Sequence, residues 1–91
     1  MSVERKTKIV ISDAITERDL GDEIVVMRNL GSEFHTLRDT ALDIWKRAHE
    51  AGTAGELLDY VTKEYGVDEE TAWTDLVTFL EDLKEKELLR F

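Results

Sequence analysis

The residues of this sequence that could carry acid–base or metal chemistry are its two histidines and its 21 carboxylates. His35 and His49 stand in separate segments, away from any serine or cysteine pattern typical of a nucleophile. The carboxylates recur along the chain as they do on solvated helix faces. Cysteine is absent, which excludes a thiolate metal site and a cysteine nucleophile. We therefore expect no catalytic residue, no metal site and no cofactor, and we do not expect an enzyme.

Phosphate-binding chemistry is disfavoured as well. Residues 52–55, Gly-Thr-Ala-Gly, lack the lysine and the strand-to-helix setting of a phosphate-binding loop. The chain has 12 Lys and Arg against 21 Asp and Glu, and a formal net charge of −9 repels a phosphate backbone. Nucleotides and nucleic acids are therefore not expected as ligands.

The 91 residues suffice for one modest hydrophobic core, so we expect a single domain over residues 1–91. Hydrophobic residues make up 42% of the chain, which separates it from disordered acidic tails. Residues 1–8 are polar with no apolar run behind them, unlike a signal peptide or a membrane span. A cytoplasmic protein with no membrane contact is expected.

Three short segments have the β-branched composition of strands, at about residues 8–12, 23–29 and 33–37. Gly21 and Asp22 supply a turn before the second segment, and residues 29–32 supply a tight reversal after it. We expect the last two segments to form an antiparallel hairpin. The first is expected at the sheet edge or packed over the rest of the fold, which gives a small N-terminal sheet of two or three strands.

Further along the chain, apolar residues recur with the 3.6-residue period of helices. The pattern predicts three helices, at about residues 39–51, 53–65 and 68–86. Asp39 or Thr40 is the candidate N-cap of the first helix, and Asp68 that of the third. Thr53 and Glu56 have the spacing of a capping box at the second. The fold class is therefore α+β, with strands first and three helices after them.

The third predicted helix has more apolar surface than one buried face needs. Its expected core stripe contains Ala72, Leu76, Phe79, Leu80 and Leu83. Trp73, Val77, Leu80 and Lys84 form a second strip beside this stripe. Either the sheet or the chain end at residues 88–91 covers the strip, or the strip lines a binding groove. In the second case, the open edge of strand 33–37 would let an extended peptide add as another strand, and the acidic surroundings would favour a basic partner.

A small sheet with three helices is also the arrangement of a winged helix-turn-helix, a fold that commonly binds DNA. The third helix would then be the recognition helix, but most of its exposed positions carry carboxylates that repel phosphates. A DNA-binding regulator therefore remains an alternative that the charge disfavours, because a fold does not by itself give a function.

Several segments together resemble the PqqD-like family. They are Gly21-Asp-Glu-Ile-Val-Val-Met27, Gly31-Ser-Glu-Phe-His-Thr-Leu37, Thr40-Ala-Leu-Asp-Ile-Trp45, Thr53-Ala-Gly-Glu-Leu-Leu58, Tyr65-Gly-Val-Asp-Glu-Glu70, Asp75-Leu-Val-Thr-Phe-Leu-Glu-Asp-Leu83 and Leu88-Leu89. The resemblance covers about residues 21–89. It departs from the family at Arg38, where an asparagine is common, and at Lys86-Glu87, where a lysine-glycine turn is common.

The resemblance implies a recognition element for ribosomally made, modified peptides (a RiPP recognition element) with a winged helix-turn-helix fold of three strands and three helices. Such domains bind the leader segment of a precursor peptide as an added strand beside the third helix. By position, the implied contacts are Glu33, Phe34, His35, Thr36 and Leu37 on the strand, and Trp73, Val77, Leu80 and Lys84 on the helix.

The resemblance further implies a stand-alone, non-catalytic adaptor that presents a leader peptide to separate processing enzymes. We favour a lasso peptide pathway, in which these enzymes are a leader peptidase and a cyclase. A chaperone of the PQQ-biosynthesis type, which serves a radical SAM enzyme, is the alternative within the family.

Overall fold

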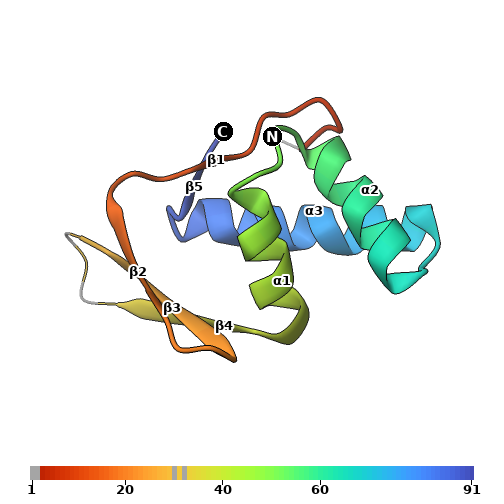
Figure 1. Ribbon diagram of the computed structural model, residues 1–91. Coiled ribbons are helices and arrows are strands. Elements are labelled where there is room, and N and C mark those ends of the chain that lie inside the picture. The colour runs from red at the N-terminus through yellow and green to blue at the C-terminus, as the bar shows by residue number, and fades with distance from the viewer. Residues whose placement is uncertain (1–2, 30, 32) are drawn as a thin grey trace.

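The computed structural model describes residues 3–29, 31 and 33–91. Strands come first along the chain, and three helices and a short last strand follow (Figure 1). The elements are β1 (Val10–Ile11), β2 (Ile15–Asp19), β3 (Glu23–Arg28), β4 (Phe34–Arg38), α1 (Asp39–Ala48), α2 (Ala54–Tyr65), α3 (Glu69–Glu85) and β5 (Leu89–Arg90). The predicted α+β class, with a three-stranded antiparallel sheet and three helices, is confirmed, whereas the winged helix-turn-helix description stays a prediction.

The sheet has the order β2-β3-β4, and both of its pairings are antiparallel. The hairpin predicted from the second and third segments is therefore confirmed as β3 and β4. Its expected tight reversal includes Leu30 and Ser32, which lie outside the described residues. The segment at residues 8–12 is not part of this sheet. Its residues Val10 and Ile11 pair instead with Arg90 and Leu89 of β5, so its expected place at the edge of the three-stranded sheet is wrong, and the segment packs over the rest of the fold as the other alternative had it.

The third strand of the sheet is β2, which the sequence pattern missed. The reason is its polarity, since Ile15 is its one apolar residue and the other four side chains are exposed. Polar side chains on its inward-facing positions find partners on α1. Glu17 accepts a hydrogen bond from Trp45 Nε1 at 2.7 Å, and Asp19 lies 3.7 Å from Lys46 Nζ. These tertiary contacts, with the ladder to β3, hold a segment of low intrinsic strand preference in place.

The predicted caps of the second and third helices are present. Thr53 Oγ1 accepts a hydrogen bond from the Glu56 N–H at 3.2 Å, and Asp68 Oδ2 accepts one from the Thr71 N–H at 2.9 Å. The pKa of Asp68 is lowered by hydrogen bonding to the Thr71 side chain and, to a smaller extent, to this backbone N–H. Gly66 ends α2 in the left-handed region, at φ 61°, as a glycine can without steric strain.

Both ends of α1 differ from the prediction. Arg38 occupies the N-cap position and makes no capping hydrogen bond to a described residue, and Asp39 has φ 53°. The helix ends at Ala48, three residues before the predicted end. The chain there turns so that the Gly52 carbonyl accepts a hydrogen bond from the Ile9 N–H at 3.1 Å. The chain after α1 is therefore bonded to the N-terminal segment and does not continue the helix.

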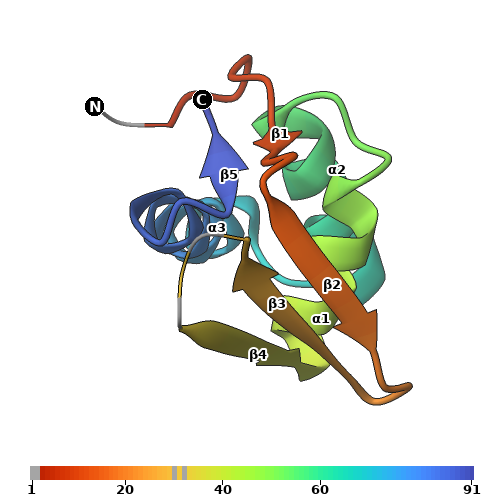
Figure 2. The same ribbon diagram turned by 90° about the vertical axis from the view of Figure 1, so that its left-hand side faces the viewer.

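The core lies between the inner face of the sheet and the helices (Figure 2). Val26 and Trp45 are fully buried there, as is Leu80 from α3. The N-terminal segment is held over the first turn of α2, where the N–H groups of Ala54 and Gly55 donate to Thr7 and Arg5 carbonyls at 2.9 and 2.7 Å. No helix in the described part of the chain is long and apolar enough to cross a membrane.

Candidate functional site

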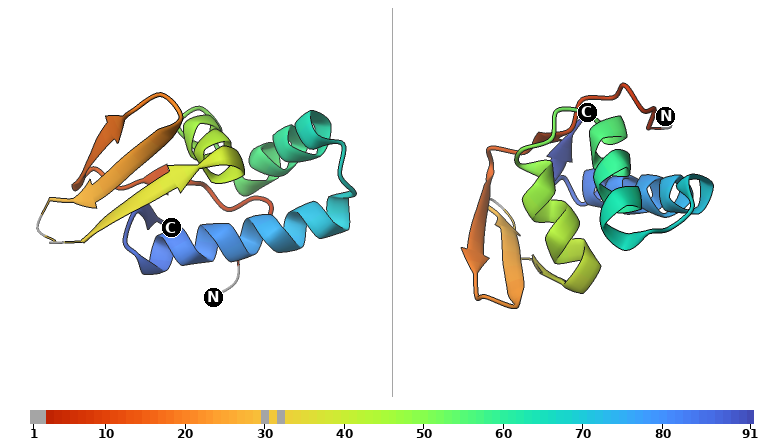
Figure 3. Two further views of the ribbon diagram at one scale, coloured as in Figure 1. Left: turned by 90° about the horizontal axis from the view of Figure 1, so that it is seen from below. Right: turned by 45° about the vertical axis from the view of Figure 1, so that its right-hand side comes forward.

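Strand β4 forms an open edge of the sheet. Among the described residues it pairs with β3 alone, and its other side faces the C-terminal half of α3 (Figure 3). Unpaired backbone amides and carbonyls on such an edge are ready to bind another strand. The site is therefore the space between this edge and α3.

The register identifies which backbone groups are free. In antiparallel pairs, hydrogen-bonded and non-hydrogen-bonded residue pairs alternate. The Leu20 N–H donates to the Glu23 carbonyl and the Asn29 N–H donates to Ala14, so alternate residues of β3, beginning at Glu23, bond to β2. The residues between them bond to β4, where their partners are His35 and Leu37. The free edge therefore presents the N–H and C=O groups of Phe34, Thr36 and Arg38.

One flank of α3 faces this edge, and it is polar at its C-terminal end. A hollow there is lined by residues of the β3–β4 region and of the end of α3: Arg28, Glu33, His35, Asp82, Glu85, Lys86 and Glu87. Four of these residues are carboxylates and two are fixed cations. Both cations already have partners, because Arg28 bonds Glu87 and Lys86 Nζ lies 2.8 Å from Asp82 Oδ2. Glu33 and Glu85 are left to give this end of the site an acidic character.

The same flank becomes apolar toward the N-terminal end of α3. A second hollow, of about 380 Å³, opens between the three helices. Its walls are mainly apolar and are formed by Thr40, Ala41, Ile44, Val61, Tyr65, Val67, Thr71, Ala72, Asp75, Leu76 and Phe79. Phe79 is half-buried and contributes to the core from one side. This flank of α3 thus carries an acidic hollow beside the start of β4 and, toward the N-terminal end of the helix, an apolar hollow between the three helices.

The strand residues predicted for the site do line this edge, on alternating faces. His35 and Leu37 point toward the helices, with Leu37 buried at 7% exposure and His35 half-buried. Phe34 and Thr36 point to the outer face of the sheet, and Phe34 is 61% exposed. Glu33 precedes the strand, is exposed and lines the polar hollow.

The helix residues predicted for the site lie elsewhere. At about 100° per residue, Trp73, Val77 and Lys84 fall on the flank of α3 opposite to Phe79, with the buried stripe between. The Arg5 guanidinium lies 4.7 Å from the centre of the Trp73 ring. Lys84 Nζ lies 4.7 Å from the ring of Phe91, in the last residue of the chain.

Arg5 of the N-terminal segment and the C-terminal Phe91 therefore lie against this strip, and Leu80, at 0% exposure, is inside the core. The structure does not bring the four helix residues to the edge of β4. The helix residues that share a hollow with the start of β4 are Asp82, Glu85 and Lys86, and Phe79 lies further along the same flank, in the apolar hollow; the sequence did not indicate any of them as site residues. Phe79 had been counted as core, and a flank of carboxylates looks in sequence like any solvated face.

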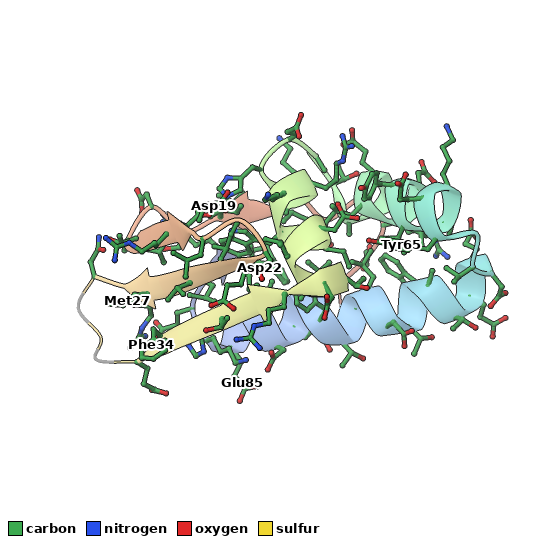
Figure 4. The ribbon with its side chains drawn as sticks, turned by 60° about the horizontal axis from the view of Figure 1, so that its bottom comes forward. Asp19, Asp22, Met27, Phe34, Tyr65 and Glu85 are labelled. Atoms are coloured by element: carbon green, nitrogen blue, oxygen red, sulfur yellow. The ribbon has the colours of Figure 1, made fainter. Side chains whose placement is uncertain are left out.

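A polar clamp closes the apolar end of the site. Tyr60 and Tyr65 of α2 donate hydrogen bonds to the two carboxylate oxygens of Asp43 in α1, and Tyr60 does so at 2.7 Å. The hydrogen bond to Asp43, with some burial, raises the pKa of Tyr65 to about 12. The same kind of bond raises the pKa of Tyr60. The clamp fixes α1 against the end of α2, and Tyr65 lies there beside the hollow (Figure 4).

Comparison with known proteins places this geometry in a family. The family model described as coenzyme PQQ synthesis protein D (PqqD) matches residues 23–89. The chain belongs to the PqqD family. The resemblance seen in the sequence is thereby confirmed, and the matched region contains β3, β4, the three helices and the first residue of β5.

Two solved structures share the fold of this PqqD-family chain. One is described as TbiB1 in complex with the TbiA(beta) leader peptide; it is 33% identical, with a TM-score of 0.83 over 89% of this chain and 94% of the other. The second is a lasso peptide synthetase B1 complexed with the leader peptide, 21% identical, with a TM-score of 0.82 over 93% and 100% of the two chains. No curated protein sequence matches the chain.

Proposed function

We propose that this protein is a non-catalytic adaptor that binds the leader segment of a ribosomally made precursor peptide and presents it to separate processing enzymes. The observation that carries the proposal is the open edge of β4 beside a flank of α3 that is hollowed at both ends. Two proteins of the same fold are described as complexes with leader peptides, and one of them is a third identical to this chain.

In this proposal the leader adds to β4 as a fourth strand of the sheet. The backbone groups of Phe34, Thr36 and Arg38 supply binding that does not depend on the leader sequence, because their partners are backbone groups of the peptide. Antiparallel addition continues the pattern of the sheet and gives slightly more stable pairing than parallel addition. The strand residues predicted from sequence, 33–37, keep their role, whereas the helix contacts move from the strip at Trp73 to the flank at Phe79.

The direction of the peptide follows from antiparallel pairing. Strand β4 runs from the acidic hollow toward the apolar one, so the bound peptide enters at the apolar end and leaves at the acidic end. An apolar side chain in its N-terminal part would fill the hollow beside Phe79. A basic residue near its C-terminal part would be attracted to Glu33 and Glu85, mainly through faster association.

We place the adaptor in a lasso peptide pathway, where it would serve a leader peptidase and a cyclase. The support is the description of the second relative, which names a lasso peptide synthetase. A second candidate, a PQQ-type chaperone for a radical SAM enzyme, is favoured by the name of the family model. Purified adaptor from either pathway would bind the precursor of that pathway alone, which separates the two candidates. A DNA-binding role has no comparable support, and the exposed face of α3 is acidic.

The experiment is a titration of the protein with the leader peptide of its cognate precursor, in which fluorescence anisotropy measures binding. A specific adaptor should bind with a Kd below about 100 µM, which corresponds to more than roughly 5 to 6 kcal/mol. N-methylation of single peptide amides tests strand addition directly, because only every second amide of an added strand faces β4. Alternating strong and weak effects would support the proposal. Uniform effects, or no binding of the unmodified leader, would refute it.

A further inference from the structure

The outer face of the sheet carries an exposed apolar patch that the leader site does not use. The patch consists of Leu20 in the β2–β3 turn, Val25 and Met27 on β3, and Phe34 on β4. Leu20 is 52% exposed, Met27 40% and Phe34 61%. Met27 and Phe34 are direct cross-strand neighbours, and Figure 4 shows them together at the end of the hairpin. Thr16, Glu17 and Arg18 form a polar rim around the same shallow depression.

The patch is too small to hold two copies of the chain together. Three exposed side chains and the half-buried Val25 present on the order of 300 Å² of apolar surface, against roughly 800 Å² per partner in a stable interface. A patch of this size, rimmed by polar residues, suits a short-lived contact with another protein.

The position of the patch indicates which protein would bind there. Phe34 belongs to both surfaces, since its backbone lies on the free edge of β4 and its side chain lies in the patch. A leader that pairs antiparallel with β4 leaves the adaptor at this end of the strand, with its C-terminal part next to Phe34 and Met27. An enzyme docked on the patch would therefore receive the part of the precursor on which it acts.

We propose that the patch of Leu20, Val25, Met27 and Phe34 is the docking surface for the processing enzyme that acts on the precursor just beyond the leader, and we take this enzyme to be the leader peptidase. The inference rests on the proposed function, because it needs a leader held on β4. It adds that presentation is a three-component event, in which peptide and enzyme contact adjoining faces of the same hairpin.

The test uses the 91-residue adaptor, its cognate precursor and the leader peptidase of the same pathway. Met27→Glu and Leu20→Glu place a charge in the patch without touching the edge of β4, and thermal unfolding checks that both variants fold. The matched control is Val10→Glu, since Val10 is 48% exposed and lies on β1, away from the hairpin (Figure 1). Leader affinity and the initial rate of precursor cleavage are measured for all four proteins.

We expect both patch variants to bind the leader like the wild type and to lower the cleavage rate roughly tenfold or more, since a charge would have to be desolvated at the enzyme surface. The control should cleave at the wild-type rate. Wild-type cleavage rates in both patch variants would overturn the inference. So would a wild-type dimer in sedimentation that Met27→Glu dissociates while cleavage is unchanged. Failure of the wild-type protein to bind leader would overturn the proposed function first, and this inference with it.

Discussion

Removing one backbone N–H from the free edge of β4 is the sharpest test of the proposed leader site. Thr36 lies in the middle of that edge, and its N–H and C=O point away from β3 because its neighbours His35 and Leu37 form the ladder. Thr36→Pro therefore removes no hydrogen bond of the folded sheet. Proline is tolerated on an edge strand when its nitrogen faces outward, and the residue before it prefers an extended conformation, which His35 already has.

The magnitude follows from the pairing. In a hydrogen-bonded antiparallel pair, the two residues exchange both of their backbone bonds, so proline at position 36 removes the bond that its N–H would donate and leaves one peptide carbonyl without a partner. Leaving that carbonyl unpaired against the edge costs about 1 to 3 kcal/mol, or about 5- to 150-fold in leader affinity. Fluorescence anisotropy with labelled leader measures the change, and circular dichroism with thermal unfolding confirms the fold.

The matched control is Asp19→Pro on β2, the other edge strand. The same register argument places the Asp19 N–H on the open side of β2, because the neighbouring Arg18 and Leu20 bond to β3. This variant also loses the Asp19 carboxylate, which accepts a hydrogen bond from the Gly21 N–H and lies near Lys46, so thermal unfolding checks its fold. The folded variant should bind leader with wild-type affinity. An unchanged affinity in Thr36→Pro, or an equal loss in Asp19→Pro, would show that strand addition on β4 is the wrong mechanism.

Three further predictions follow from named contacts. Phe79→Ala should weaken leader binding by roughly 1 to 3 kcal/mol while Trp73→Ala leaves it unchanged, and the reverse result in the same titration would return the site to the flank at Trp73. The hydrogen bond to Asp43 raises the pKa of Tyr65 to about 12, so the folded state favours the neutral phenol. This hydrogen bond therefore stabilises the folded protein fully below pH ~10, and the stabilisation is lost as the pH rises toward about 12. Urea unfolding over this range should show that loss in the wild type and a smaller one in Tyr65→Phe. Glu87 has φ 62°, a conformation that glycine adopts with less strain. Glu87→Gly is therefore expected to raise the free energy of unfolding by roughly 0.5 to 1 kcal/mol in urea titrations. A decrease would mean that the ion pair of Glu87 with Arg28 outweighs the strain.

Glu87 also links a sequence departure to a structural feature. The family resemblance places a glycine after the lysine at the end of the third helix, and this chain has Glu87 there. The structure shows a left-handed residue at this position, the conformation in which glycine is common after a helix. The glycine of the family pattern thus indicates a left-handed backbone position, which Glu87 adopts at a cost in conformational free energy.

The sequence by itself determined the elements whose signals are local. The periodicity of residues 39–86 located three helices, and Thr53 and Asp68 located two of their starts, because a cap needs only groups within three residues. The β-rich composition of residues 23–29 and 33–37, with the turn signal between them, located the hairpin. Composition also showed that the third helix is too acidic for a DNA-binding helix.

Only the tertiary structure decided what lies against each flank of α3. A helical repeat shows which residues share a face, but Trp73 and Phe79 both border the buried stripe, and their sequence pattern does not say which one meets β4. That choice depends on contacts between residues distant in sequence. The Arg5 guanidinium lies over the Trp73 ring, and the Lys84 ammonium lies over the Phe91 ring. Strand β2 was hidden for the same reason, because its polar residues become a strand through a ladder to β3 and partners on α1, and not through their own preference.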